Sequence, residues 1–320
     1  MRDVMGATDA VVRSGVVSPF QASLRVALRR MQEVWARIRH SRTAMVGLAI
    51  LVFFIGMAVF APWVAPYGPI DRVADTSNCV PGVSCPLSPP SAQHPLGISE
   101  EGADIYSQVI WGSQISLIVG IFSAMVASVL GTAVGLVSGY MGGWVDEVMM
   151  RFNDVVLSVP WLVLMIVVAA RIGTIDLLGL ILVIGLTGWS ITARVIRAQV
   201  LSVKERLFVE RARMIGSSRS HILMRHIFPN AFPLIFANTI LTVAVSILSE
   251  AVLAFLGLSI YNTVSWGKVI NQAIGGGALV IGGNVWWLIV PGLCLVFLVF
   301  GFYLFGFALD EILNPRLRRR

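Results

Sequence analysis

The stretch VERARMIGSSRSHILMRHIFPN, residues 209–230, interrupts a largely apolar chain with four arginines grouped around one glycine. The part before the glycine contains neither glycine nor proline and favours a helix. Gly216 suits a left-handed turn that ends this helix, and Ser217 or Ser218 suits the cap of a second one. Pro229 is then expected to stop the second helix. The pattern predicts two short helices joined by a bend, each too short to cross a membrane.

The rest of the chain has the composition of a membrane protein. Of its 320 residues, 57% are hydrophobic and 13% are charged, which is more apolar than a soluble domain. A helix needs about 20 mostly apolar residues to cross about 30 Å of hydrocarbon. Six segments meet this length, the third only just, at 43–62, 113–140, 155–172, 176–194, 230–257 and 286–308. The predicted fold is an all-α integral membrane protein with six transmembrane helices.

Basic residues are placed so that they set the orientation of these spans. Lys and Arg gather in the arm at 1–42, between the fourth and fifth spans, and in the tail at 309–320, whereas the loops at 63–112 and 258–285 are poor in them. The positive-inside rule therefore puts both termini and the segment at 201–229 in the cytoplasm, with the first loop outside the cell membrane. The net charge of +7 reflects topology, and nucleic acid is not an expected partner.

Two regions outside the predicted spans, at 20–42 and 71–95, can each be interpreted in two ways. Residues 20–42 form either a basic amphipathic helix that binds anionic membrane lipid or a disordered arm. The Pro-rich loop at 71–95 either shapes a docking surface or is unstructured. Cys79 and Cys85 lie in this exterior loop, where an oxidising environment favours a disulfide, with two free thiols as the alternative. No metal site is expected, because no other Cys or His lies near them at ligand spacing.

Small and ionisable residues inside the spans indicate contacts between helices. Gly131, Gly135 and Gly139 form a stripe in the second span where another helix can approach closely. Glu250 stands well inside the fifth span, where a carboxylate is costly and therefore a candidate for function. We favour a structural role, in which it accepts hydrogen bonds from a neighbouring helix or loop, over direct contact with the substrate. Either role predicts that Glu250→Gln lowers transport or assembly.

The motifs of an enzyme are missing from the sequence. It contains no phosphate-binding loop and no HExxH, and no Ser, His and Asp set stands out. His221 and His226 are five residues apart, a spacing that suits polar surface residues better than metal ligands. A transporter without a nucleotide site must take its energy from elsewhere, which favours a non-catalytic permease that docks on a separate ATPase. A self-sufficient secondary carrier and a membrane-embedded enzyme or receptor are the alternatives.

The opening stretch resembles the loop signature of the permeases of ABC importers, written EAA, three residues, Gly, and a hydrophobic residue followed by Pro. The matching positions are Glu210, Ala212, Gly216 and Pro229, the last of them thirteen residues beyond the glycine. Arg211 stands where the signature has its first Ala, and Phe228 replaces the usual Leu. The residues that this resemblance assigns to ATPase coupling are Glu210, Arg211, Ala212, Gly216, Ser220, His221 and Pro229.

Other stretches, from about residue 40 to 320, are similar to the second permease subunit of the dipeptide, oligopeptide and nickel branch. They are HPLG at 94–97, ISLIVG at 115–120, GYMGGWVDEVMMRFNDVVLSVP at 139–160, FLGLSI at 255–260, SWG at 265–267 and LDEILNPRLRR at 309–319. After HPLG the branch has Gly-Thr-Asp and then Gly-Arg-Asp, whereas this chain has Ser99 and Ala103. A family role for this exterior segment is therefore not carried over.

The resemblance implies a type I ABC importer permease fold, with a core at 113–308 and coupling helices between the fourth and fifth spans. It implies a heterodimer with a homologous permease, two ATP-binding-cassette ATPases, and an extracytoplasmic solute-binding protein. ATP and Mg are then bound by the ATPases, and this chain binds no cofactor. The helices at 205–228 are expected to lie in a cleft of one ATPase. Peptides are the leading substrate, with nickel chelates and oligosaccharides as alternatives.

Overall fold

The structure is a computed structural model, and it describes residues 32–33, 35–73, 89–173, 176–279 and 284–313. Within these residues the chain is helical, and the only pairing of extended backbone is two isolated bridges near Ala103 and Asp104. Five helices are long and apolar enough to cross a membrane, and a bent pair makes a sixth candidate. Cys79 and Cys85, most of the N-terminal arm and most of the basic tail lie outside the described residues.

The helices follow in an order that matches the predicted spans. They are α3 (Arg42–Val59), α4 (Ala61–Val64), α5 (Ile105–Met141), α6 (Gly143–Ser158), α7 (Trp161–Ile172), α8 (Leu177–Lys204), α9 (Leu207–Met214), α10 (Arg219–Ile222), the π-helical turn η2 (Leu223–Ile227), α11 (Phe228–Phe255), α12 (Trp266–Gly275) and α13 (Trp286–Leu313).

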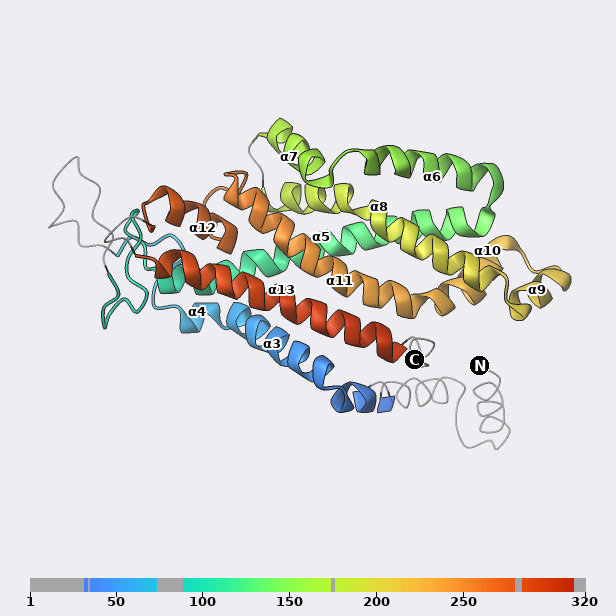
Figure 1. The fold of residues 1–320 in the computed structure, drawn as a ribbon, viewed down its shortest axis with the longest axis horizontal. Helices are drawn as coiled ribbons and strands as arrows, with labels where there is room; N and C mark the ends of the chain where they lie inside the picture. The colour runs from blue at the N-terminus through green and yellow to red at the C-terminus, as the bar shows by residue number, and fades with distance from the viewer. Residues whose placement is uncertain (1–31, 34, 74–88, 174–175, 280–283, 314–320) are drawn as a thin grey trace.

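The long helices run side by side along the length of the molecule (Figure 1). In this bundle α5 packs against α8 and α11, while α13 packs against α3 and α11. The short helices α9 and α10 lie at one end of the bundle, and α4 and α12 lie at the other (Figure 1). The start of α3 and the end of α13 point toward the same end as α9, as the predicted topology requires (Figure 1).

The second span is longer than predicted, because α5 begins at Ile105. Asp104 caps this helix by accepting a hydrogen bond from the backbone N–H of Ser107 at 2.8 Å. The predicted loop at 63–112 is therefore wrong at its end, because the helix already includes residues 105–112. Gly112 does not bend the helix. A Cβ at this position would lie 2.9 Å from the ring of Trp266, so the glycine allows close packing of α12 on α5.

The third predicted span, 155–172, is not one straight helix. Its residues belong to α6 and α7, which meet at an angle of 83°. Pro160 causes this break, because proline has no N–H for the helix and pushes the preceding residue out of the helical region. Val159 is indeed extended, with φ −86° and ψ 128°. The break gives α6 and α7 separate directions beside α8 (Figure 1).

The expectation that Pro229 stops a second short helix is also wrong. From Arg219 to Phe255 the chain is a continuous helical segment, so α10 is the first turn of the fifth span. The turn before the proline widens to π-helical spacing, in which the N–H of Phe228 donates to the carbonyl of Leu223 five residues back. Pro229 then occupies the first turn of α11, where a missing N–H is tolerated.

Candidate functional site

The basic segment, defined here as residues 201–229, is anchored to the bundle by one face of α9. Val209 is fully buried and Ala212 is 5% exposed, and both belong to an apolar cluster with residues of α5, α8 and α11. The other members of this cluster on the long helices are Leu136, Tyr140, Ile196, Val200, Val203, Ala231 and Ile235. Because its buried face belongs to a cluster that α5, α8 and α11 share, and because α9 packs against α8, α9 is anchored to the bundle.

A complete helix-ending motif follows α9. Gly216 has φ +79°, which confirms the predicted left-handed turn. Its N–H donates to the carbonyl of Arg213 at 3.0 Å, and the N–H of Ser217 donates to the carbonyl of Ala212 at 3.1 Å. This pair of bonds is the Schellman arrangement, which satisfies the last carbonyls of the helix. Ser218 then caps α10, because its hydroxyl accepts the N–H of His221 at 3.3 Å.

The outer face of the basic segment carries both charged and apolar side chains in solvent. Met214 is 79% exposed and Ile215 is 81% exposed, at the tip beside Gly216. The sequence-predicted residues that are also exposed on this segment are Glu210, Arg211, Ser220 and His221. Pro229 is exposed as well, but it belongs to α11 rather than to the tip. The structure thus puts Glu210, Arg211 and Gly216 on one projecting element and separates Pro229 from it.

The glycine stripe of the second span packs on α8 within the same chain. A Cβ at Gly131 would lie 2.7 Å from the carbonyl oxygen of Trp189, and one at Gly135 would lie 2.6 Å from that of Ala193. At Gly139 a Cβ would lie 2.9 Å from the Cβ of Val200. The backbones of α5 and α8 therefore approach too closely for any side chain at these positions, and the two helices form one unit.

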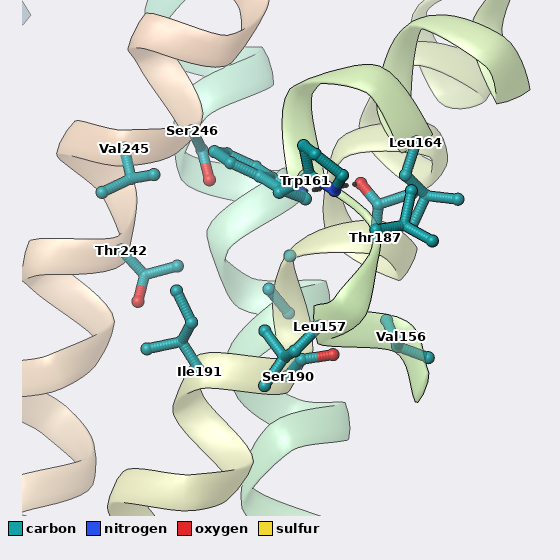
Figure 2. Close-up of a pocket in the computed structure, with 14 residues that line it drawn as sticks. Val156, Leu157, Trp161, Leu164, Thr187, Ser190, Ile191, Thr242, Val245 and Ser246 are labelled. Atoms are coloured by element: carbon teal, nitrogen blue, oxygen red, sulfur yellow. Dashed lines mark hydrogen bonds between the residues drawn. The ribbon is translucent and has the colours of Figure 1, made fainter. Parts of the chain in front are cut away.

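The bend between α6 and α7 leaves a small pocket that opens to the surface of this chain, and we call it the central cavity. It has a volume of about 160 Å³. Its lining comes from four parts of the chain: Ala127 on α5, residues 156–164 around the bend, residues 187–191 on α8, and residues 242–246 on α11. Thr242 and Ser246 lie on one side of the space, and Val156 and Leu164 lie on the other (Figure 2). The lining is mostly apolar.

Four hydroxyl groups and one indole give the central cavity its polar character. The indole N–H of Trp161 donates to the hydroxyl of Thr187 at 3.1 Å, which ties the start of α7 to α8 (Figure 2). Ser190 is buried, and its hydroxyl has no hydrogen-bond partner among the described residues. Such a group remains available to a polar molecule that enters the space. Sequence analysis missed this site, because its residues come together only after four helices pack.

Glu250 does not line the central cavity. Its side chain is 1% exposed, and its carboxylate accepts a hydrogen bond from the hydroxyl of Ser116 on α5 at 3.0 Å. The side chain of Ser265, the cap of α12, also lies beside this carboxylate. Glu250 therefore joins three elements: α11, on which it lies, α5 and the start of α12. This geometry fits the structural role that we favoured for it, and it gives no route to direct contact with the lining of the central cavity.

The opposite end of the bundle carries the segment in which this chain departs from the branch. Ser99 accepts the backbone N–H of Ala103 at 3.0 Å and closes the turn before Asp104, which also bonds to His94 at 2.9 Å. A polar cavity of about 270 Å³ lies beside it, and Lys268 lines that cavity. Burial lowers the pKa of Lys268, while nearby Glu101 opposes this shift. The described residues contain no group of His, Cys, Asp and Glu that could hold a metal ion.

Comparison with known protein families identifies two matching regions. A family model described as the binding-protein-dependent transport system inner membrane component matches residues 131–319, which is more than half of the chain. A second model, the N-terminal transmembrane domain of oligopeptide transport permease C, matches residues 29–90. The two matches cover the basic segment, the first span and every lining residue of the central cavity except Ala127.

Full-length relatives show the same likeness. The dipeptide transport system permease protein of Bacillus subtilis (strain 168) is 32% identical over 300 residues, which are 92% of this chain and 88% of that protein. The glutathione transport system permease protein of Escherichia coli O157:H7 is 34% identical over 287 residues, 89% of this chain and 90% of that protein. An inward-facing structure of the MetNI methionine ABC transporter covers 67% of this chain and 97% of its own with a TM-score of 0.53 and 19% identity. This last likeness confirms the predicted type I importer permease fold.

Proposed function

The chain belongs to the family of binding-protein-dependent transport system inner membrane components, and we propose that it forms one half of the path through which an ATP-driven importer moves short peptides. Membership makes it a multi-pass membrane protein of a transport system. One part of this chain would then contact an ATPase, and another part would contact the solute.

The basic segment is proposed as the site that docks on an ATPase. Support comes from its two opposite faces, since one face of α9 is buried on the ends of three long helices while the tip is exposed. Apolar side chains as exposed as Met214 and Ile215 are typical of a surface that a protein partner covers. Next to them, Glu210 and Arg211 supply charges that fix the orientation of a partner. This rigid, two-faced projection is the observation that carries the proposal.

A binding site for ATP and Mg belongs, in this proposal, to the ATPase subunits and not to this chain. A second permease pairs with this one to complete the path, and an external solute-binding protein delivers the solute to the end of the bundle that carries α4 and α12. The cytoplasm is then on the side of α9. This orientation also places the start of α3 and the end of α13 in the cytoplasm, in agreement with the basic arm and tail.

The central cavity is proposed as part of the solute path. Its hydroxyl groups can donate and accept hydrogen bonds with peptide amides, and none of the described residues that line it is charged. Such a lining suits a neutral or zwitterionic solute that must pass without binding tightly. Relatives named for a dipeptide and for glutathione, which is itself a short peptide, favour short peptides over nickel chelates and oligosaccharides.

Purification of the tagged chain from its native membrane in mild detergent tests the proposal. We expect a second permease and ATPases with phosphate-binding loops to co-purify. Ile215→Asp should remove the ATPases and leave the second permease bound, because it places a charge on the proposed docking tip. Ile70→Asp is the matched control, since Ile70 is also exposed but belongs to the opposite end of the chain's bundle. Recovery of the chain alone, still able to move peptide without ATP, would instead indicate a secondary carrier.

A further inference from the structure

A second cavity lies where the basic segment meets the ends of the spans, and we call it the basic cavity. It has a volume of about 360 Å³, room for a group much larger than a water molecule. Three parts of the chain form it: the end of α5, the end of α8, and the stretch from α9 to α10. Its lining residues are Tyr140, Met141, Lys204, Arg213, Ser217, Arg219 and Ile222.

Positive charge is concentrated in this space. Lys204, Arg213 and Arg219 all line it, and no Asp or Glu is among the described residues that do. Across the described part of the chain, none of these three cations takes part in an ion pair. The Arg213 guanidinium lies 6.0 Å from the centre of the Tyr140 ring, a weak cation–π distance that leaves its N–H donors free for another acceptor.

The contrast with neighbouring cations on α8 shows that this arrangement is specific. Arg197 donates twice to the carboxylate of Asp146, at 2.6 Å for both bonds, and Arg194 pairs with Asp154 at 2.5 Å. Those cations have acidic partners on α6. Lys204, about two turns beyond Arg197 on α8, has no acidic partner within the described residues and lines the cavity with two more cations instead. Three like charges around a shared space repel one another, and an anion in that space would offset the repulsion.

The depth of the basic cavity points to the chemistry of the anion. Two of its walls are the last residues of α5 and α8, which are candidate membrane spans. Trp144, three residues beyond the end of α5, is 76% exposed, and exposed tryptophans favour the interface between hydrocarbon and water. Phosphate groups of phospholipids lie at this interface. Guanidinium groups bind phosphate through pairs of charge-assisted hydrogen bonds.

We propose that the basic cavity binds the phosphate of an anionic phospholipid headgroup. Lys204, Arg213 and Arg219 neutralise the phosphate, and the Ser217 hydroxyl donates one further hydrogen bond. Because these residues belong to α8, α9, the turn and α10, one bound headgroup links the basic segment to the ends of the spans. Anionic lipid therefore holds the basic segment in the position from which its tip can engage a partner.

Native mass spectrometry of the purified complex tests this proposal, with phosphatidylglycerol as the probe and phosphatidylcholine as the neutral comparison. Each cation near a membrane surface contributes about fivefold to the affinity for anionic lipid. Arg219→Gln should therefore weaken phosphatidylglycerol binding about fivefold, and the combination with Arg213→Gln should weaken it by about 25-fold. Arg225→Gln is the matched control, because Arg225 is exposed on the basic segment but does not line the cavity. It should bind phosphatidylglycerol as the unchanged protein does.

Four results would overturn the proposal. One is equal retention of phosphatidylglycerol by the single variant and the unchanged complex, which does not depend on the double variant being stable. Another is equal retention of phosphatidylcholine and phosphatidylglycerol by the unchanged complex. The third is competition by inorganic phosphate at millimolar concentration, which would assign the cavity to free phosphate rather than lipid. Binding of phosphatidylglycerol only after the ATPases are removed would assign the cavity to the ATPase interface and also refute the lipid proposal.

Discussion

Substitution of Gly216 tests whether the basic segment works through its turn. The residue has φ +79°, and no atom lies within 4 Å of the place where a Cβ would stand. A side chain at this position therefore meets open space in the chain, and its cost is that of the backbone conformation alone. The left-handed region costs an ordinary L-residue about 1–2 kcal/mol, while asparagine adopts it more readily.

These magnitudes predict an order of variants. Gly216→Ala should disfavour the native turn by about 1 kcal/mol, and Gly216→Val by about 2 kcal/mol or more because its side chain is branched at Cβ. The second figure lowers the ratio of native to altered turn about 30-fold. Gly216→Asn should stay close to the unchanged protein, although its side chain is about as large as that of valine. The predicted order of coupling is Gly, Asn, Ala and then Val.

The assay is ATP-driven uptake of a labelled dipeptide by the complete complex in proteoliposomes, measured together with the ATP hydrolysed. Loss of the turn should lower the peptide moved per ATP in the order given, while the second permease stays bound. Unchanged transport by Gly216→Val would refute the claim that the turn matters. Equal loss by Gly216→Asn and Gly216→Val would refute the conformational reason, because it would mean that a partner fills the space beside residue 216.

Three further predictions concern the bundle. Gly135→Ala should lower the apparent Tm of the purified complex, with a cost of roughly 1–3 kcal/mol from overpacking, because its Cβ would lie 2.6 Å from a backbone carbonyl of α8. Gly56→Ala is the control and should not lower the Tm, because its Cβ meets no atom within 4 Å and alanine favours a helix more than glycine does. Arg197→Gln should lower the same Tm more than Arg194→Gln does. The loss of stability should be about 1.5–3 kcal/mol for Arg197→Gln and less than about 1 kcal/mol for Arg194→Gln, because only Arg197 forms a partly buried pair with two hydrogen bonds. Equal shifts in Tm would contradict this. Glu250→Leu should lower the yield of assembled complex, because it removes the acceptor of the buried Ser116 hydroxyl at a cost of about 1–3 kcal/mol. Glu250→Gln should lower the yield less. Normal yield and normal uptake in both variants would exclude a structural role and a transport role.

Local chemistry was sufficient for much of the fold. The spans follow from runs of apolar residues, because a membrane span satisfies its own backbone hydrogen bonds and needs no partner to be recognised. The turn at Gly216 and the cap at Ser218 follow from properties of single residues. The proline at 160 also indicates a break in the helix, but the third span was predicted from hydropathy alone and therefore included this position.

Other features depend on geometry that a sequence does not display. Pro229 was expected to end a helix, and the rule failed because a π-helical turn before it removed the conflict. In the sequence, Ser99 and Ala103 are only residues that differ from those of the permease branch after HPLG. The structure shows that they close a turn, in which the Ser99 hydroxyl accepts the backbone N–H of Ala103. The central cavity was the feature least accessible to prediction, because its lining residues, such as Ala127 and Ser246, are far apart in the sequence.

The arrangement of α8 and α11 suggests how the two proposed sites communicate. Both helices contact α9 through the buried cluster, at Val200 and Val203 on α8 and at Ile235 on α11, and both line the central cavity farther along. On α8 the distance from this contact to Ile191 is nine residues, or about 14 Å of unbroken helix. The glycine stripe joins α5 to α8 without room for sliding, and α11 packs against both of these helices, so we expect the three helices to move as one body. The start of α7 is joined to this body by the hydrogen bond of Trp161 and the bend at Pro160, and Met165 and Ala169 of α7 are buried in an apolar cluster with residues of α8. A displacement of α9 by an ATPase would therefore shift the walls that α5, α8 and α11 give to the central cavity together.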